Sequence, residues 1–404
     1  MRMLYIIPSF QHPKVRGPNR HYHFIRELSQ RHSITLLTLI SSEIPAEAMQ
    51  EMASYTERIL TFGSNGTSNL REGRRLEHLP LIGDRMERTL RLRAGIKQMK
   101  NAFSQLAAQG SYDLVLFHGK SVFPVIEDCS ELPIVADFCD ATSTRVRTKM
   151  SYASKAKLPL LGLRYLQIRR VEKKLVRKTS HIAFISVRDR EAILGPDDRS
   201  QVIPNGLDLQ YWRRKSNSRQ PNCLIFTGVM NYAPNEDAAL YLIDEILPFL
   251  RQSVPRLEVL IVGRDPTSAL SERARRHTEV TVTGFVEDMR PYLERAAIFA
   301  APVRYASGMQ NKIQEAMAME VPVVTTSAVA GGLRIGSGPE PPLYVADEPR
   351  VFADSISSLL VQDSERARLA AEGRQFAERN FDWPRSAQQL EHMCLEAVRK
   401  NDRS

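Results

Sequence analysis

The sequence predicts an α/β protein made of two Rossmann-like domains whose parallel sheets face each other across a cleft. Three observations support this prediction. The chain has 404 residues, which suits two ordinary domains better than a single core. Short apolar strands rich in β-branched residues alternate with amphipathic helical stretches, the pattern of parallel sheets covered by helices on both faces. A polar stretch that ends in proline, residues 209–221, separates two such halves.

The N-terminal domain is predicted to span residues 1–208. Its first buried strand is expected in MLYIIP, followed by a loop over residues 9–19, a helix in RHYHFIRELSQ and a strand in ITLLTL. Further strands are expected in DLVLF, IVADF, AFISV and QVIPNG. The apolar run MLYIIP is too short for a signal peptide, and no small-residue cleavage site follows it.

The C-terminal domain is predicted to span residues 222–383. Its strands are expected in CLIFTG, LEVLIVG, VTVTGF, AIFAAPV and VPVVTT, with helices in EDAALYLIDEILPFLRQ and NKIQEAMAM between them. Ligands of open parallel sheets bind beyond the carboxyl ends of the strands. Two facing sheets would therefore hold two substrates in one cleft, and closure of the domains would expel water from between them.

The composition is that of a globular protein, with 43% hydrophobic and 25% charged residues. No run of roughly 18 apolar residues occurs, so no transmembrane helix is expected. The four cysteines show no C-x-x-C spacing, which indicates a reducing, cytoplasmic setting and neither a disulfide framework nor a zinc site. They are Cys129, Cys139, Cys223 and Cys394.

The net charge of +10 belongs to the N-terminal domain, because residues 1–208 carry 32 Lys and Arg against 21 Asp and Glu. Such one-sided basic charge points to a polyanionic partner or a membrane surface. Residues 74–100 and 164–178 mix Leu, Ile and Met with Arg and Lys at helical spacing, as interfacial membrane helices do. Ordinary solvated helices with buried apolar faces are the alternative. Nucleic acid is disfavoured because aromatic residues are not regularly interleaved with the basic ones.

Residues 302–326 carry the strongest chemical signal. A strand leads through the small-residue loop RYASG into a helix over about residues 309–319. The free N–H groups and the positive dipole end at the start of such a helix suit a pyrophosphate. Asn311 and Lys312 would add donors and positive charge, and the Glu315 carboxylate, one turn on, would accept two hydrogen bonds from a ribose diol. The alternative is an ordinary strand–helix–strand unit with a solvated lysine and glutamate.

This segment resembles the signature of the retaining glycosyltransferase family 4, the glycosyl transferases group 1. In that family the helix G-x-P-x-K-x-x-E-A-M-A leads to a strand G-x-P-V-V. The matching residues are Lys312, Glu315, Ala316, Met317, Ala318 and Pro322 to Val324. Residues 202–208 (VIPNGLD), 226–238 and 263–296 match three further family segments in the same order. The resemblance implies the GT-B fold, and the similar closing segment FDWPRSAQQLEHM implies that residues 384–404 form a helix crossing back to the N-terminal domain.

The resemblance also implies a donor site in the C-terminal domain. Glu315 would bind the ribose hydroxyls of the donor, and Phe285 and Val286 would pack on its base. Ser307 stands where the family has a first acid that contacts the donor sugar, so the identity of the sugar is left open.

A second departure concerns the positive charge that faces the leaving diphosphate. The family's usual Arg and Lys pair is replaced by Asn231 and Tyr232, so the expected cations are Arg264, Arg304 and Lys312. The expected donor-binding residues are Gly17, Gly228, Asn231, Arg264, Phe285, Val286, Arg304, Ser307, Gly308, Met309, Gln310, Asn311, Lys312 and Glu315.

In the N-terminal domain, the loop VRGPN (residues 15–19) resembles the family's glycine-containing loop near the donor phosphates, with a plain turn as the alternative. The segment ADFCDATS ends the strand at which many relatives carry a catalytic histidine. Asp137 or Asp140 would there orient the acceptor hydroxyl or accept its proton, and helix capping is the alternative role of Asp140. The expected catalytic residues are Asp140, Asp137, Lys312 and Glu315, and the expected acceptor-side residues are Arg16, Asn19 and His118.

The implied activity is that of a retaining glycosyltransferase of the hexosyltransferase type. Because Arg and Lys side chains can neutralise the leaving diphosphate, no metal is expected, and no cofactor besides the UDP- or GDP-sugar co-substrate. The acceptor is expected to be lipid-linked, a polysaccharide or a small molecule, in surface polysaccharide or glycolipid synthesis at the cytoplasmic face of the membrane. Glycosylation of a natural product, a nucleotide-sugar 2-epimerase and a non-catalytic subunit of a glycan assembly complex stay open as alternatives.

Overall fold

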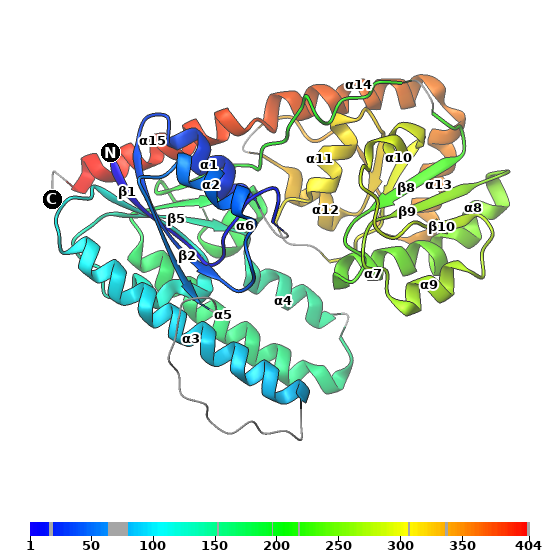
Figure 1. The fold of residues 1–404 in the computed structure, drawn as a ribbon. Coiled ribbons are helices and arrows are strands. Elements are labelled where there is room, and N and C mark those ends of the chain that lie inside the picture. The colour runs from blue at the N-terminus through cyan, green and yellow to red at the C-terminus, as the bar shows by residue number, and fades with distance from the viewer. Residues whose placement is uncertain are drawn as a thin grey trace.

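Two parallel β-sheets, one in each half of the chain, organise the fold and confirm the predicted fold class (Figure 1). The computed structural model describes residues 1–15, 19–63, 80–151, 153–195, 197–216, 219–305, 308–335 and 338–401, and only the backbone of residues 80–88. None of the helices in these ranges is long and apolar enough to cross a membrane.

The first sheet, as far as the chain is described, has seven parallel strands in the order β3-β2-β1-β4-β5-β6-β7. The strands are β1 (Arg2–Ile7), β2 (Ser33–Ile40), β3 (Arg58–Gly63), β4 (Leu114–His118), β5 (Ile134–Cys139), β6 (His181–Phe184) and β7 (Ser200–Val202). Strands β1, β2 and β4 to β6 bury nearly every residue, as strands covered on both faces do.

Helices cover the two faces of this sheet with separate apolar cores. On one face pack α1 (Arg20–Leu28), α2 (Ala46–Ser54) and α15 (Trp383–Asn401). On the other pack α3 (Pro80–Ala107), η1 (Lys120–Val125) and α5 (Leu158–Lys178). The remaining helices of this half are α4 (Thr142–Ser151), η2 (Lys155–Lys157) and α6 (Val187–Ile193).

The second sheet has six parallel strands over the described residues, in the order β10-β9-β8-β11-β12-β13. They are β8 (Cys223–Thr227), β9 (Glu258–Val262), β10 (Val280–Val282), β11 (Ile298–Ala301), β12 (Val323–Thr325) and β13 (Tyr344–Val345). The helices are α7 (Ala233–Tyr241), η3 (Leu242–Ile246), α8 (Leu247–Ser253), α9 (Ser268–Ala274), α10 (Arg290–Arg295), α11 (Asn311–Ala318), α12 (Ser327–Leu333), α13 (Pro349–Val361) and α14 (Asp363–Asn380). One continuous apolar core lies between this sheet and the helices that cover it.

The chain passes between the two halves twice. It leaves the first sheet after β7 and returns from α14 into α15, which runs along α1 (Figure 1). At the return the Leu207 N–H donates to the Phe381 carbonyl at 3.0 Å, and the Trp383 ring stacks on His23 with centroids 4.3 Å apart. Further along α15, the Glu391 carboxylate accepts hydrogen bonds from Arg31 and His32. The two crossings of the chain are therefore packed against each other, and we call this place the hinge.

The hinge leaves no room for a side chain at Gly206. A Cβ built there collides with the ring and backbone nitrogen of Trp383. We expect Gly206→Ala to destabilise the protein by about 1–3 kcal/mol, as overpacking does. Gly162 in α5 has nothing within 4 Å of its built Cβ, so Gly162→Ala is expected to stabilise the protein by roughly 0.5–1 kcal/mol through helix propensity. Calorimetric melting of both variants tests the pair, and equal shifts would refute the close packing at the hinge.

Candidate functional site

A cavity of about 600 Å³ opens between the carboxyl-terminal edges of the two sheets. Its size is within the range of roughly 300–1,000 Å³ that sites for small ligands usually have. From the first half it is lined by Cys139, Asp140, Ile185 and Asn205, and from the following segment by Tyr211 and Trp212. From the second half it is lined by Thr227, Gly228, Val229, Asn235, Gly263, Arg264, Phe285, Val286, Glu287, Met289, Gly308, Met309, Gln310, Asn311, Lys312 and Glu315. We call this cavity the cleft.

The floor of the cleft is the start of α11. The loop that leads into this helix has Gly308 in the left-handed region at φ +65°. The first-turn N–H groups of a helix have no partner within it, and they carry the positive end of its dipole. Asn311 and Lys312, the first two residues of α11, line the cleft at this place. The floor is therefore suited to an anion such as a diphosphate.

Lys312 and Glu315 are two partly buried, titratable groups on this floor. The Lys312 ammonium donates a hydrogen bond to the Asn235 side-chain oxygen and lies 4.6 Å from the centre of the Phe226 ring. Burial lowers the pKa of Lys312 to about 7, although the charge of Glu315 opposes this. Burial likewise raises the pKa of Glu315 to about 7 against the charge of Lys312. Such opposite displacements are characteristic of functional sites.

The back wall of the cleft is bare backbone. A Cβ at Gly263, which has φ +149°, collides with the Gly228 carbonyl, and a Cβ at Gly228 would lie 2.6 Å from the Asn235 side-chain nitrogen. The loops after β8 and β9 therefore meet without side chains between them. Arg264 follows directly and lines the cleft, with its Nε 3.8 Å from the Asp265 carboxylate.

An aromatic rim surrounds the cleft at the end near β10. The Phe285 ring is 76% exposed although it lines the cavity. The Tyr211 and Trp212 rings meet edge to face with centroids 5.2 Å apart, and the Arg290 guanidinium lies 3.9 Å from the Tyr211 ring centre. Flat apolar surfaces of this kind suit stacking with a nucleobase.

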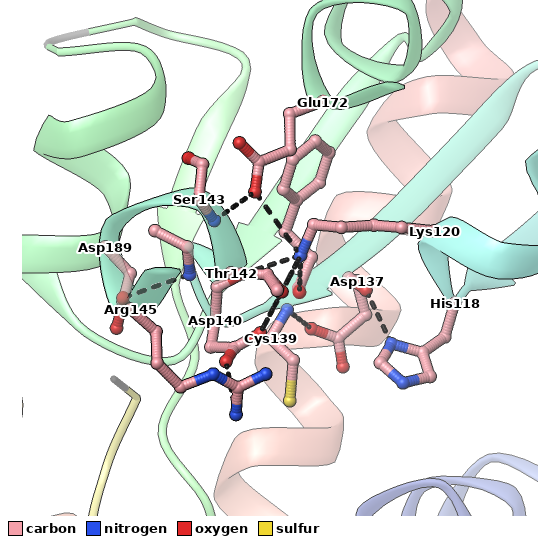
Figure 2. Close-up of polar contacts among 12 residues, drawn as sticks. His118, Lys120, Asp137, Cys139, Asp140, Thr142, Ser143, Arg145, Glu172 and Asp189 are labelled. Atoms are coloured by element: carbon pink, nitrogen blue, oxygen red, sulfur yellow. Dashed lines mark hydrogen bonds and ion pairs between the residues drawn. The ribbon is translucent and has the colours of Figure 1, made fainter. Parts of the chain in front are cut away.

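On the opposite wall, Asp140 ends the turn after β5. A Cβ built on Gly308 would lie 3.4 Å from the Asp140 Cβ, so this residue directly faces the loop before α11. The carboxylate accepts a hydrogen bond from the Thr142 hydroxyl at 2.9 Å, and Lys120 and Arg145 each lie 3.7 Å from it (Figure 2).

Hydrogen bonds from Lys120 fix the turn that carries Asp140. The Lys120 ammonium donates to the Asp140 carbonyl at 2.7 Å and to the Thr142 hydroxyl at 3.0 Å (Figure 2). N–H groups at the start of α4 donate to other carboxylates, with Ala141 bonding Asp189 and Ser143 bonding Glu172. Asp189 and Glu172, which are distant in the sequence, therefore cap these N–H groups. The sequence had suggested this role for Asp140, which lines the cleft instead.

Asp137 requires a correction, because its carboxylate does not line the cleft. It is buried and accepts hydrogen bonds from the Arg20 Nε at 2.6 Å and from the Cys139 N–H at 3.0 Å. Burial opposes its ionisation, but the charge of Arg20, with those of His21 and His118, lowers its pKa to about 2. A carboxylate so strongly held is a poor proton acceptor at neutral pH. Asp137 therefore shapes the turn to Asp140 and does not reach a substrate.

Four further expected residues lie outside the lining of the cleft, namely His118, Asn19, Arg304 and Asn231. The His118 Nδ1 hydrogen-bonds with the Asp137 carbonyl at 2.8 Å (Figure 2). Asn19 precedes α1, the Arg304 guanidinium is paired with Asp237, and Asn231 is exposed. The expected residues Arg16, Gly17 and Ser307 lie outside the described residues.

Two buried side chains, His21 and Asp137, and the half-buried His118 bring potential metal-ligating atoms within 4.8 Å of one another. The Asp137 carboxylate is already bonded to the Arg20 guanidinium, whose positive charge would oppose a cation at the same oxygens. The residues of this cluster therefore do not fit a divalent ion.

Two residues, Asn205 and Arg188, make hydrogen bonds across the domain boundary that the sequence did not predict. The Asn205 side chain accepts a hydrogen bond from Arg20 at 2.9 Å and donates one to the Asn311 side chain at 3.0 Å. The Arg188 guanidinium, on α6, donates to the Gly308 carbonyl at 3.3 Å and to that of Ala328. Asn205 lies in VIPNGLD, one of the segments that resemble the family, whereas no sequence pattern indicated a role for Arg188.

The raised pKa of Glu315 makes its ionised form costly in the folded protein. Its pKa is about 7 when folded against an ordinary value of 4.5, so this cost grows between about pH 4.5 and pH 7 and is constant above. We expect Glu315→Gln to raise the melting temperature more at pH 8 than at pH 5. Glu279, whose pKa the Arg251 hydrogen bond lowers, is the control, and Glu279→Gln should lower the melting temperature at pH 8. A gain for Glu315→Gln that is equal at both pH values would contradict the burial effect.

Comparison with known proteins gives a family match for the second half. Residues 221–362 match the family described as glycosyl transferases group 1. The D-inositol 3-phosphate glycosyltransferase of Corynebacterium efficiens is 26% identical over 222 residues, which are 50% of this chain and 52% of that protein. The alignment thus covers about half the length of this curated relative.

Solved structures match nearly the whole chain. The Anabaena protein Alr3699/HepE in complex with UDP has a TM-score of 0.67 at 15% identity, covering 98% of this chain and 100% of that chain. Sucrose-phosphate synthase from Thermosynechococcus elongatus has a TM-score of 0.67 at 16% identity, covering 98% of each chain. At such identity these likenesses show the fold alone. The chain therefore has the two-domain GT-B fold, and the family match of residues 221–362 supports a glycosyltransferase.

Proposed function

We propose that this protein is a retaining, hexosyltransferase-type glycosyltransferase that moves a sugar from a nucleoside diphosphate sugar to an acceptor hydroxyl. One observation carries the proposal: Asp140 from one domain faces Gly308, in the loop that leads into α11, from the other. A donor whose diphosphate lies on α11 would present its sugar to this gap. An acceptor entering from the first domain would meet the sugar beside Asp140.

The donor would occupy the second-domain wall of the cleft. Its base would stack at Phe285 and Val286, and its ribose diol would donate hydrogen bonds to the Glu315 carboxylate. Its diphosphate would meet the N–H groups at the start of α11, with Lys312 and Arg264 as cations. Because the free-state pKa of Lys312 is about 7, the negative diphosphate would favour the protonated ammonium on binding. These cations would stabilise the leaving group without a divalent metal, and UDP- and GDP-sugars are the donors we propose.

The acceptor hydroxyl would be oriented by Asp140. Thr142, Lys120 and Arg145 hold this carboxylate at the cleft wall. We propose that the hydroxyl attacks the face of the sugar from which the diphosphate leaves, with the leaving phosphate helping to accept the proton. The configuration at the anomeric carbon would then be kept.

Lys312→Ala and Glu315→Ala are expected to lower donor turnover by about 100-fold or more, the usual effect of removing one preorganised charged contact. Asp140→Asn should lower transfer similarly while leaving the affinity for the nucleoside diphosphate unchanged, because Asp140 lies on the opposite wall. Asn231→Ala, which changes an exposed residue beside the cleft, is the matched control and should behave as wild type. Binding is measured by calorimetry with UDP and GDP, and turnover by release of nucleotide from a panel of nucleotide sugars. Wild-type turnover in Lys312→Ala and Glu315→Ala would refute the assignment.

The same panel separates the two other activities considered. Incubation with a UDP-N-acetylhexosamine and no acceptor would yield the 2-epimer if the protein were an epimerase. A protein that binds no nucleoside diphosphate would be a non-catalytic member of the fold. Either outcome would replace the proposed transfer.

We further propose that the first domain binds a membrane surface and that the acceptor is lipid-linked, in surface polysaccharide or glycolipid synthesis. Helices α3 and α5 both pack on the same face of the first sheet (Figure 1). Their exposed leucines are Leu90, Leu92, Leu160, Leu163 and Leu166, of which Leu160 is 72% exposed. Basic side chains accompany them, so this surface suits an anionic bilayer. The expected basic residues 74–79 lie outside the described residues.

We expect the triple variant Leu160→Ser, Leu163→Ser and Leu166→Ser to weaken binding to vesicles of phosphatidylcholine and phosphatidylglycerol by about tenfold or more. The matched control is Val351→Ser with Val361→Ser, which changes exposed apolar residues on the second domain. Co-sedimentation measures both. Equal binding of the triple variant and wild type would contradict membrane docking through α5 and leave the donor site unaffected.

A further inference from the structure

A second cavity, of about 570 Å³, lies at the opposite edge of the first sheet from the cleft. Strands β5 and β6 begin there, and α5 and α15 end there. The proposed glycosyltransferase reaction has no use for this place, because both of its substrates would meet at the carboxyl ends of the strands. We call this cavity the basal pocket.

Positive charge dominates the basal pocket. Among its described lining residues are four basic side chains, Arg177, Lys178, Arg199 and Lys400, and no carboxylate. Arg199 is paired with Asp197 at 2.8 Å, and that acid does not line the pocket. The wall that a ligand would meet is therefore cationic.

His181, the first residue of β6, supplies the second and independent observation. It lines the basal pocket, is only 3% exposed, and neither of its ring nitrogens has a hydrogen-bond partner among the described residues. A buried polar group without a partner costs about 1–3 kcal/mol. Burial lowers the pKa of His181, and the charges of Lys400 and Arg199 act in the same direction against those of Glu396 and Asp197. The neutral ring therefore offers one N–H donor.

Helix dipoles explain only part of this arrangement. Arg177 and Lys178 end α5 and Lys400 stands near the end of α15, where cations complement the negative helix end. That effect gives no reason for Arg199 and an unpaired, buried His181 to converge on the same pocket from the strand side. A ligand with several acceptor oxygens and negative charge would satisfy all of these groups together.

We propose that the basal pocket binds a phosphate group, either inorganic phosphate or the phosphomonoester of a small molecule or lipid headgroup. His181 donates one ring N–H to a phosphate oxygen, and the cations around it balance the charge. The ligand ties the end of α15 to the first sheet. This proposal is independent of the activity at the cleft.

The test follows the ring resonances of the histidines by NMR while inorganic phosphate is added, with the His181 signal assigned from His181→Gln. We expect the His181 signal to shift saturably, and the signal of the exposed His392, which lies on α15 but outside the basal pocket, to stay still. Because this resonance reports on His181 alone, phosphate that binds in the cleft does not alter the result. A His181 signal that phosphate leaves unmoved overturns the proposal.

Two charge-matched double variants on α5 test the cations. Arg177→Gln with Lys178→Gln should weaken phosphate binding at His181 by about tenfold, as expected for losing charge-assisted hydrogen bonds. Lys173→Gln with Lys174→Gln removes the same charge one turn earlier, outside the basal pocket, and should change the affinity by no more than about twofold. Equal weakening by both pairs would mean general charge attraction and would overturn the site.

The same two pairs distinguish the source of the phosphate. Glycerol 3-phosphate is compared with phosphatidylcholine vesicles that contain phosphatidic acid. Vesicle binding that needs Arg177 and Lys178 assigns the pocket to a lipid headgroup. Binding of glycerol 3-phosphate without vesicle binding at this site assigns it to a soluble phosphomonoester.

Discussion

A chain of hydrogen bonds, buried on the side of the first domain, joins the two walls of the cleft. Asp137 binds Arg20, Arg20 binds Asn205, and Asn205 binds Asn311 at the start of α11. Arg20 is only 3% exposed, so its charge is tolerable only because this chain satisfies it. Asp137 also accepts from the Cys139 N–H, which fixes the turn that ends at Asp140. The same buried charge therefore positions a group on each wall, and the rest of the site depends on it.

The site is consequently a property of the interface and not of either domain. The second domain supplies a helix start suited to an anion, a wall of bare backbone at Gly228 and Gly263, and two groups, Lys312 and Glu315, whose pKa values are displaced by burial. Such features lower the stability of the fold, a cost that is common at functional sites. The first domain supplies Asp140 at the facing wall. Movement at the hinge would change the gap between them without altering either wall.

Much of this arrangement was predictable from local sequence. The alternation of strands and helices predicted both sheets, because the periodicity of apolar residues reflects which faces of an element are buried. Lys312 and Glu315 were found from their place at the start of one helix. Asp137 and Asp140 could not be told apart, because only the packing of Arg20 against β5 decides which carboxylate is buried. Tyr211, Trp212 and Arg188 were missed for the same reason: their roles come from contacts with residues distant in the chain.

We propose above all that a nucleoside diphosphate binds with its base at the aromatic rim and its diphosphate on α11. Photolabelling with an azido-base analogue of UDP or GDP, followed by peptide mapping, tests this position directly. We expect labelling of peptides that contain Phe285 or the pair Tyr211 and Trp212, and excess unmodified nucleotide should displace it. Displaceable labelling confined to peptides of the first sheet or its helices would contradict it.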